Sequence, residues 1–196
     1  GMRFWWASRM SDHPFLAPDF AIRWTRLTPE HVRPDIGLAL QRAEAAIAEI
    51  AARDLGGLTY ENTFLALERA TEELNAAWGK VTHLQSVADS PALREAHNAM
   101  LPQVSAFYAK IPLNPELWRR LRTVAESEDG RAQKGIHRRY IDETVAEFRL
   151  AGADLPTEQR ARIEALQSEL AQVTQKYSEN VLDATNAWQL VVTDET

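Results

Sequence analysis

Apolar residues recur at steps of three and four through most of the chain, the spacing that places them on one face of an α-helix. The clearest series has apolar residues at 32, 36, 40, 43, 47 and 50. Thr28-Pro29-Glu30 precedes it and is typical of a helix start, with a capping hydroxyl, a first-turn proline and an early acid. Gly56-Gly57 follows it and is typical of a helix end. We therefore predict a long helix between these two signals, with one buried face.

Three further helices are predicted by the same rule. The second follows Thr59 and has its buried stripe at residues 64, 67, 71, 74, 78, 81 and 84. Ser90-Pro91 opens the third, whose apolar face contains residues 93, 96, 100, 104, 107 and 111. Pro102 lies inside this helix, and we expect a bend or break there because proline lacks the backbone donor. Asn114-Pro115-Glu116 opens a short fourth helix.

The rest of the chain completes an all-α bundle of about six helices with short connections. The polar stretch 126–130 predicts a loop, and a fifth helix runs from about Ile136 to Gly152. The last helix begins near Pro156, and its apolar residues 163, 166, 170, 173 and 177 have coiled-coil-like spacing, which we interpret as packing inside the bundle. Residues 12–26 contain Pro14 and Pro18 and predict an irregular segment. Residues 188–193 have the composition of one short strand.

Composition excludes several classes of function. The net charge of −6 argues against a general nucleic-acid binder, which needs a basic surface. The chain has no cysteine, so it has neither disulfides nor thiolate metal ligands. No apolar run approaches the roughly 18 residues that a membrane-spanning helix requires. We therefore expect a cytoplasmic protein that binds neither nucleic acid nor membrane.

The first residues are interpreted separately from the domain. Gly1 before Met2 is typical of a tag remnant, and Met10 begins a stretch that reads as a second possible start. We assign residues 1–11 to a remnant and N-terminal extension, and residues 12–196 to one helical domain. If the extension is ordered, its aromatic residues Phe4, Trp5 and Trp6 are expected to pack on an apolar groove.

The histidines do not form a recognisable metal site. The chain has five, and no two are four residues apart, so none begins the H-E-x-x-H motif of a zinc hydrolase. We interpret His83 as a packing residue beside the core stripe, and His97 and His137 as surface or half-buried residues.

Other candidate chemistry is equally sparse. The chain has no G-x-S-x-G sequence and no phosphate-binding P-loop. Trp24, Trp78, Trp118 and Trp188 are interpreted as core anchors rather than as a surface that stacks a ligand. We therefore assign no catalytic, cofactor-binding or metal residue.

Five segments occur in an order that resembles the N-terminal helical region of the oligopeptidase A, thimet oligopeptidase and neurolysin family of zinc endopeptidases. The resemblance covers roughly residues 12–196 and ends on YSENVLDAT. The five segments are HPFLAPDF, LTPEHVRPDIGLAL, LTYENTFLALE, residues 78–111 and residues 148–188.

The resemblance implies a function that this chain does not complete by itself. In the family, a downstream region carries zinc on H-E-x-x-H and a further glutamate, and the helical N-terminal region forms the opposing wall of a narrow channel for short peptides. No position of this sequence matches the zinc motif. We therefore expect the N-terminal part of a zinc oligopeptidase, without cofactor and inert alone.

An alternative reading stays open. The chain could be a free-standing helical binding or regulatory module derived from such a peptidase. The first reading, an N-terminal part of a peptidase, predicts an exposed apolar surface near the last helix and residues 188–192, or a homodimer or extra packing that hides it.

Overall fold

The computed structural model describes residues 13–191, and it confirms an all-α fold. Phe4, Trp5 and Trp6 lie outside the described residues, so their predicted packing stays a prediction. The α-helices in the described range are α2 (Pro29–Ala52), α3 (Ala66–Val87), α4 (Pro91–Lys110), α5 (Pro115–Glu126), α6 (Glu128–Ala132), α7 (Gly135–Ala151) and α8 (Thr157–Ala187).

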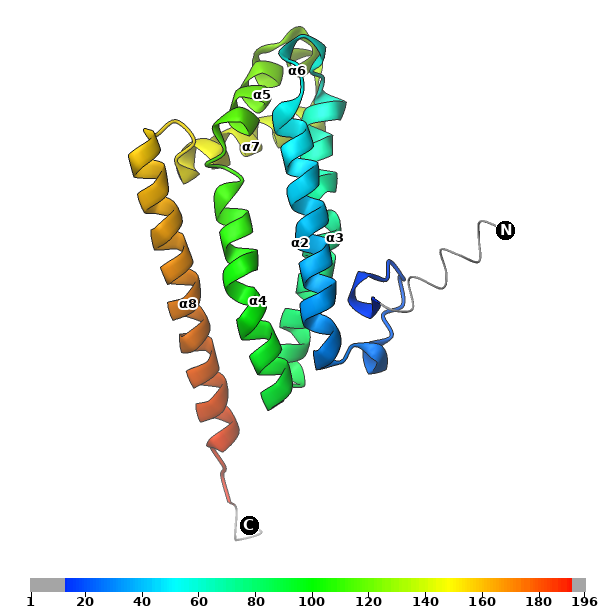
Figure 1. Cartoon of the computed structure of the whole chain (residues 1–196), viewed down its shortest axis with the longest axis vertical. Coiled ribbons are helices and arrows are strands. Elements are labelled where there is room, and N and C mark those ends of the chain that lie inside the picture. Colours follow the sequence, from blue (N-terminus) through cyan, green and yellow to red (C-terminus); the bar gives the residue numbers. More distant parts are fainter. Residues whose placement is uncertain (1–12, 192–196) are drawn as a thin grey trace, which may run out of the picture.

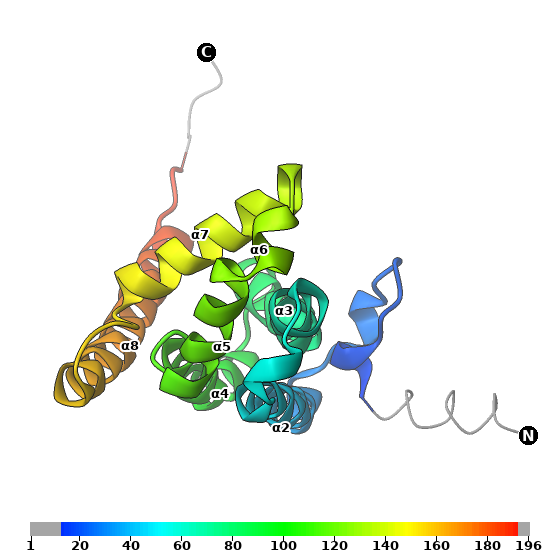
Figure 2. The same cartoon turned by 90° about the horizontal axis from the view of Figure 1, so that it is seen from above.

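The long helices lie roughly side by side, and the shorter ones gather at one end (Figure 1). α4 lies between α2 and α8, while α3 packs behind α2 and α4. Seen from above, α5 and α7 cross over that end of the bundle (Figure 2). α8 therefore stands at the edge, where α4 is its main contact among the described elements.

The core forms where α2, α3, α4 and α5 meet. All six apolar positions predicted for the first helix are buried, and Leu74, Leu117 and Leu121 are completely inaccessible. α7 adds Ile141 and Phe148 to this cluster. Helix starts are also where the sequence predicts them, since Ser90 and Asn114 accept hydrogen bonds from the backbone N–H groups of α4 and α5.

The irregular N-terminal segment is fixed to the bundle by buried polar contacts. It forms two short 3₁₀ turns, Pro14–Leu16 and Trp24–Arg26. The fully buried carboxylate of Asp35 on α2 bonds to His13 Nδ1 and to the backbone N–H of Phe15, both at 2.8 Å. Lys80 Nζ on α3 donates to the carbonyl oxygen of Phe15 at 2.8 Å. Burial lowers the pKa of Lys80, against the opposing charges of Asp19 and Asp35.

The structure differs from the sequence analysis at two points along the helices. α4 continues through Pro102, so the helix is not broken there. Residues 128–132 form α6 instead of a loop, because the Ser127 side chain accepts from the backbone N–H of Gly130 and caps the turn. Gly130 is buried against α5, where a Cβ would lie 2.0 Å from the carbonyl oxygen of Val124. This glycine permits close approach rather than ending a helix.

The predicted C-terminal strand is also not formed in the described part of the chain. Trp188 has extended backbone angles, φ −81° and ψ 131°, but residues 188–191 pair with no other segment there. A strand needs a partner to satisfy its backbone groups, and the helical bundle supplies none at this end. Residues 192–193 lie outside the described residues.

Candidate functional site

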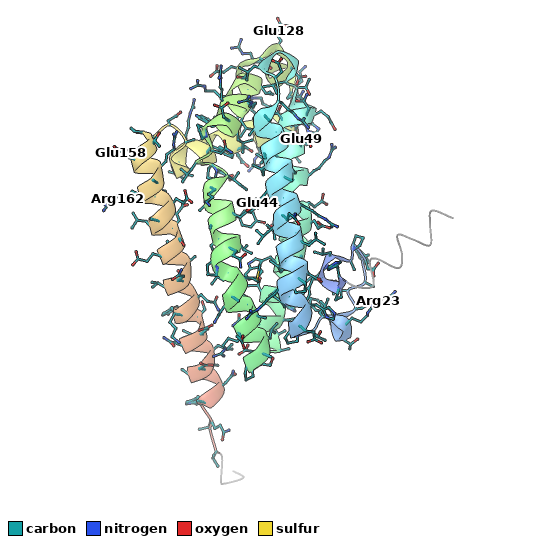
Figure 3. The ribbon with its side chains drawn as sticks, viewed as in Figure 1. Arg23, Glu44, Glu49, Glu128, Glu158 and Arg162 are labelled. Atoms are coloured by element: carbon teal, nitrogen blue, oxygen red, sulfur yellow. The ribbon has the colours of Figure 1, made fainter. Side chains whose placement is uncertain are left out.

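A groove of about 490 Å³ lies between α2 and α4. Its apolar wall includes Leu40 and Ile47 of α2 and Phe107 of α4. Glu44 of α2, labelled in Figure 3, and Lys110 of α4 place opposite charges along it. Binding sites for small ligands typically have volumes of about 300–1,000 Å³ with mixed apolar and polar walls. The groove therefore has the size and chemistry to hold a few residues of an extended peptide.

A second polar feature lies between α4 and α8, and we call it the α4–α8 seam. It consists of Arg94 and Asn98 of α4 with Glu179 and Asp183 of α8. Asn98 Nδ2 donates to Glu179 Oε1 at 2.6 Å, and the Arg94 guanidinium donates to both oxygens of Asp183, at 2.7 and 2.9 Å. The same guanidinium also donates to Asp89. The seam therefore attaches α8 to α4 by charge-assisted hydrogen bonds.

The environment of the seam lowers the pKa values of both acids of α8. Burial acts to raise the pKa of Glu179, but hydrogen bonds from Asn98 and Gln175, with nearby cations, lower it below its ordinary value. The hydrogen bonds from Arg94 lower the pKa of Asp183. Both carboxylates thus stay ionised at neutral pH, as a seam that depends on charge requires.

His97 lies beside the seam and is 1% exposed, so its interpretation as a surface or half-buried residue is wrong. Its ring stacks on Trp78 at 4.8 Å, and its Nδ1 lies 3.1 Å from Asn98 Oδ1. Nε2 is buried without a hydrogen-bond partner in the described part of the chain. Burial lowers the pKa of His97. The spacing from Leu93 to His97 to Met100 follows the helical stripe and could have predicted this burial.

The other histidines are dispersed over the molecule. His31 pairs with Thr28 at the start of α2, and the exposed His137 lies 2.9 Å from the Tyr60 hydroxyl. His83 is exposed rather than packed beside the core, although its ring contacts Trp24 at 5.1 Å. No group of three or more histidine, aspartate or glutamate residues suited to a metal ion occurs in residues 13–191.

The four tryptophans divide into two pairs. Trp118 is a core anchor, as predicted, with its Nε1 donating to Asp154 Oδ1 at 2.9 Å, and Trp78 is partly buried against the core. Trp24 and Trp188 are exposed, so the same prediction is wrong for them. Trp188 is the residue that follows α8, and its side chain is not part of the main core cluster.

The apolar stripe of α8 also differs from its interpretation. Packing inside the bundle was expected, but Leu166, Leu170, Val173, Tyr177 and Val181 are between 48% and 69% exposed. The alternative expectation of an exposed apolar surface is confirmed, and it continues to Trp188, Leu190 and Val191. The heptad spacing is real, but the face that it marks is turned away from α4.

Comparison with known proteins identifies the family. Residues 39–160 match the family model "Neurolysin/Thimet oligopeptidase, N-terminal domain". The chain belongs to this family. Oligopeptidase A of Escherichia coli is 30% identical to it over 93% of the chain, but over only 27% of the relative's length.

Other relatives show the same partial coverage. Oligopeptidase A of Salmonella typhimurium is 30% identical over 88% of the chain and 25% of the relative. The organellar oligopeptidase A of Arabidopsis thaliana is 28% identical over 95% of the chain and 23% of the relative. The chain thus spans about a quarter of the length of these curated relatives.

Among residues 13–191, every helix is too short or too polar to cross a bilayer.

Proposed function

We propose that this chain is the N-terminal, channel-wall part of a zinc-dependent oligopeptidase that hydrolyses short peptides, and that it is inert alone. The observation that carries the proposal is the match of residues 39–160 to the N-terminal domain of this peptidase family. This chain matches only about a quarter of each relative's length. That partial coverage supports the assignment of the catalytic chemistry to the part of the relatives that this chain does not match.

The side chains present here do not fit a catalytic zinc site. Such a site needs at least three convergent protein ligands and an open position for water. The sequence has no H-E-x-x-H, and the described residues contain no suitable group of ligands. No catalytic step is therefore assigned to any residue of this chain, and its proposed contribution is to bind peptides and to limit their access.

An activity assay tests the inert state directly. The purified chain is incubated with zinc and a quenched fluorescent short peptide, with and without a chelator, and Oligopeptidase A of Escherichia coli serves as the positive control. We expect no hydrolysis by the chain. Chelator-sensitive hydrolysis by the chain would contradict the proposal.

A chimeric enzyme tests whether this chain forms the wall of the peptide channel. The matching region of the Escherichia coli relative is replaced by residues 12–196, and a second enzyme lacks that region entirely. We expect the chimera to cut short peptides and to spare long unfolded chains, because the wall narrows the channel. If both enzymes show the same dependence on substrate length, this chain does not form the wall.

Two finer assignments belong to the same proposal. Residues 12–196 form one domain, and limited proteolysis should leave this range intact while residues 1–11 are removed. The protein is cytoplasmic, and cell fractionation of the native host should place it in the soluble fraction; recovery with membranes would contradict this.

The second candidate is a free-standing helical binding module. The exposed apolar stripe of α8 favours it, because a contiguous apolar surface is typical of a site that binds another protein. The coding sequence downstream of codon 196 separates the two candidates. An H-E-x-x-H there, in frame or frameshifted, favours the peptidase, and its absence together with a captured partner favours the module.

A further inference from the structure

Glu44 places an acid without a cationic partner in the groove between α2 and α4. It lies on the side of α2 that faces α4 (Figure 3), and its side chain is exposed. Glu49, further along the same helix, pairs instead with Arg53. Glu44 makes no ion pair or hydrogen bond within residues 13–191. The groove therefore offers a free carboxylate to a ligand.

The lysine that lines the groove is directed to a different acid. Lys110 Nζ of α4 lies 3.6 Å from Glu164 Oε1 of α8, and α8 is on the opposite side of α4 from α2. Lys110 and Glu164 largely balance each other's charge, so Glu44 leaves the groove with an excess of negative charge. The other polar residues that line the groove are uncharged amides, Gln41, Gln103 and Asn114.

The floor of the groove is apolar, and its rim carries small residues. Leu40, Ile47 and Phe107 belong to the hydrophobic core, so packing against the core sets their positions. On the rim, a Cβ added to Gly37 would meet no atom within 4 Å, and Ala48 is exposed. Apolar walls with a few polar groups are typical of a site that orients a ligand while burying part of it.

The length of the groove matches a short extended segment. Its lining residues on α2 run from Gly37 to Ala48, which is roughly 16 Å at about 1.5 Å per residue. An extended peptide rises about 3.3 Å per residue, so about five residues fill this length. Glu44 lies roughly 10 Å from the Gly37 end, beside the third or fourth residue of such a segment.

The width of the groove favours an extended peptide over a helix. Two helices in contact have axes about 8–10 Å apart, whereas a helix with its side chains is about 10–12 Å across. A third helix would therefore lie over the groove between α2 and α4 rather than inside it. An extended peptide is narrower and can reach the apolar floor.

We propose that the α2–α4 groove binds a short peptide in extended form, with a lysine or arginine side chain of the peptide at Glu44 and an apolar neighbour on the floor. This inference rests on the proposed function, since it names the class of peptide that the wall favours. The apolar contact supplies most of the affinity, and the contact with Glu44 supplies the selection for a cation. An acidic peptide is disfavoured, because two carboxylates would face each other.

Nuclear magnetic resonance of the isotope-labelled full chain, titrated with a pentapeptide, tests the site. The probe is acetylated and amidated Ala-Leu-Lys-Leu-Ala, so the lysine side chain carries its only charge. We expect saturable shifts of the backbone signals of residues 37–48 and 103–114. The peptide with glutamine in place of lysine should bind roughly threefold more weakly at low salt, as expected for the loss of an exposed ion pair. The proposal is wrong if neither peptide binds, or if the shifts lie outside these two ranges.

Charge variants test the role of Glu44. Glu44→Gln should remove the preference for lysine, so that the two peptides bind equally. Lys110→Gln should instead increase the preference, because the groove loses its own cation. Glu147→Gln removes an exposed acid of α7, outside the groove, and should leave the preference unchanged. A preference for lysine that persists in Glu44→Gln would contradict the assignment of the cation to this residue.

A pair of matched variants tests whether the peptide occupies the groove. Ala48→Phe adds a large side chain at the exposed rim and should weaken the binding of both peptides at least tenfold. Ala45→Phe makes the same change at an exposed position of α2 that does not line the groove, and it should have little effect. Circular dichroism of each variant checks that the helices are retained. Equal binding by the two variants would show that the peptide binds elsewhere.

Failure of this inference and failure of the proposed function give different results, because the titration involves neither zinc nor hydrolysis. Peptide binding in the groove, together with a chimera that does not select short substrates, would overturn the channel-wall role alone. A chimera that selects short substrates, together with no peptide binding in the groove, would overturn this inference alone.

Discussion

α2 and α8 flank α4 on opposite sides, and they differ in what they bury. α2 has 24 residues and buries eight of them, seven apolar residues and Asp35. α8 has 31 residues, and Glu179 alone is buried among its described side chains. Both helices carry apolar residues at helical spacing. The spacing therefore shows that an apolar face exists, while the neighbouring elements decide whether that face is covered.

The difference also concerns the forces that attach each helix. α2 is attached by apolar packing against α3, α4 and α5, which contributes about 25 cal/mol for each Å² buried. α8 is attached to α4 mainly through the α4–α8 seam, and a net hydrogen bond contributes only about 0.5–1.5 kcal/mol. We therefore expect α8 to open locally before the core unfolds.

The largest effect is expected in the core. Leu74→Ala on α3 removes a completely buried side chain and should lower the free energy of unfolding by about 2–5 kcal/mol. Leu170→Ala on α8 is the matched control, and it should cost far less because this side chain is 64% exposed. Urea denaturation measures both. Equal losses of unfolding free energy in the two variants would contradict the distinction between the buried core and the exposed face of α8.

Asn98→Ala tests the attachment of α8 through the seam. The buried carboxylate of Glu179 loses its short hydrogen bond, which should cost about 1–3 kcal/mol. Hydrogen exchange should accelerate along α8 and stay unchanged in α2. Gln103→Ala changes an exposed amide on the same helix and should affect neither. Uniform acceleration in both helices would show that α8 belongs to the cooperative core.

Gly152→Ala tests the turn that leads from α7 toward α8. Gly152 has φ 108°, and a Cβ would lie 2.8 Å from Leu155 Cδ1 and 3.1 Å from Ile163 Cδ1. Alanine should therefore cost about 1–2 kcal/mol. Gly79→Ala, in α3 with open space around it, should instead stabilise by up to about 1 kcal/mol. Thermal unfolding of both variants measures whether Gly152→Ala lowers the stability while Gly79→Ala raises it.

The smallest effect is a pH dependence from His97. Its folded pKa is lowered from 6.5, so the unfolded chain binds the proton first as the pH falls. Stability contributed by neutral His97 is present above pH 6.5 and is lost below it, with a slope of at most about 1.4 kcal/mol per pH unit. His97→Gln should flatten the profile of unfolding free energy against pH between pH 7 and pH 5.

The seam acids act in a separate, more acidic window. The pKa values of Glu179 and Asp183 are lowered from 4.5 and 3.8, so their stabilising contribution is present above those values and is lost below them. If the stability of His97→Gln depends on pH in the same way as that of the unchanged chain, the loss of stability below pH 6.5 belongs to another group.

Much of the fold followed from the sequence, and particular residues show why. Ser90, Asn114 and the stripe of α2 were predicted correctly, because caps and helical spacing act within a few residues of one another. Gly130 was misread as part of a loop, because its role depends on the backbone of α5 that approaches it. His97 was misplaced although its spacing marked it as buried.

The candidate site was less accessible to prediction. The seam joins residues more than 80 positions apart in the sequence, such as Asn98 and Glu179, and no local pattern links them. The groove between α2 and α4 likewise depends on how the two helices are separated in space.

The sequence by itself determined most of the helices, the caps of α4 and α5 and the membership of a peptidase family, because these depend on local spacing and on the order of motifs. The tertiary structure decided which apolar faces are covered. α2 and α8 carry similar stripes, but burial depends on the neighbours that the bundle brings within van der Waals contact. α4 meets the polar face of α8, and for this reason the apolar stripe of α8 remains exposed.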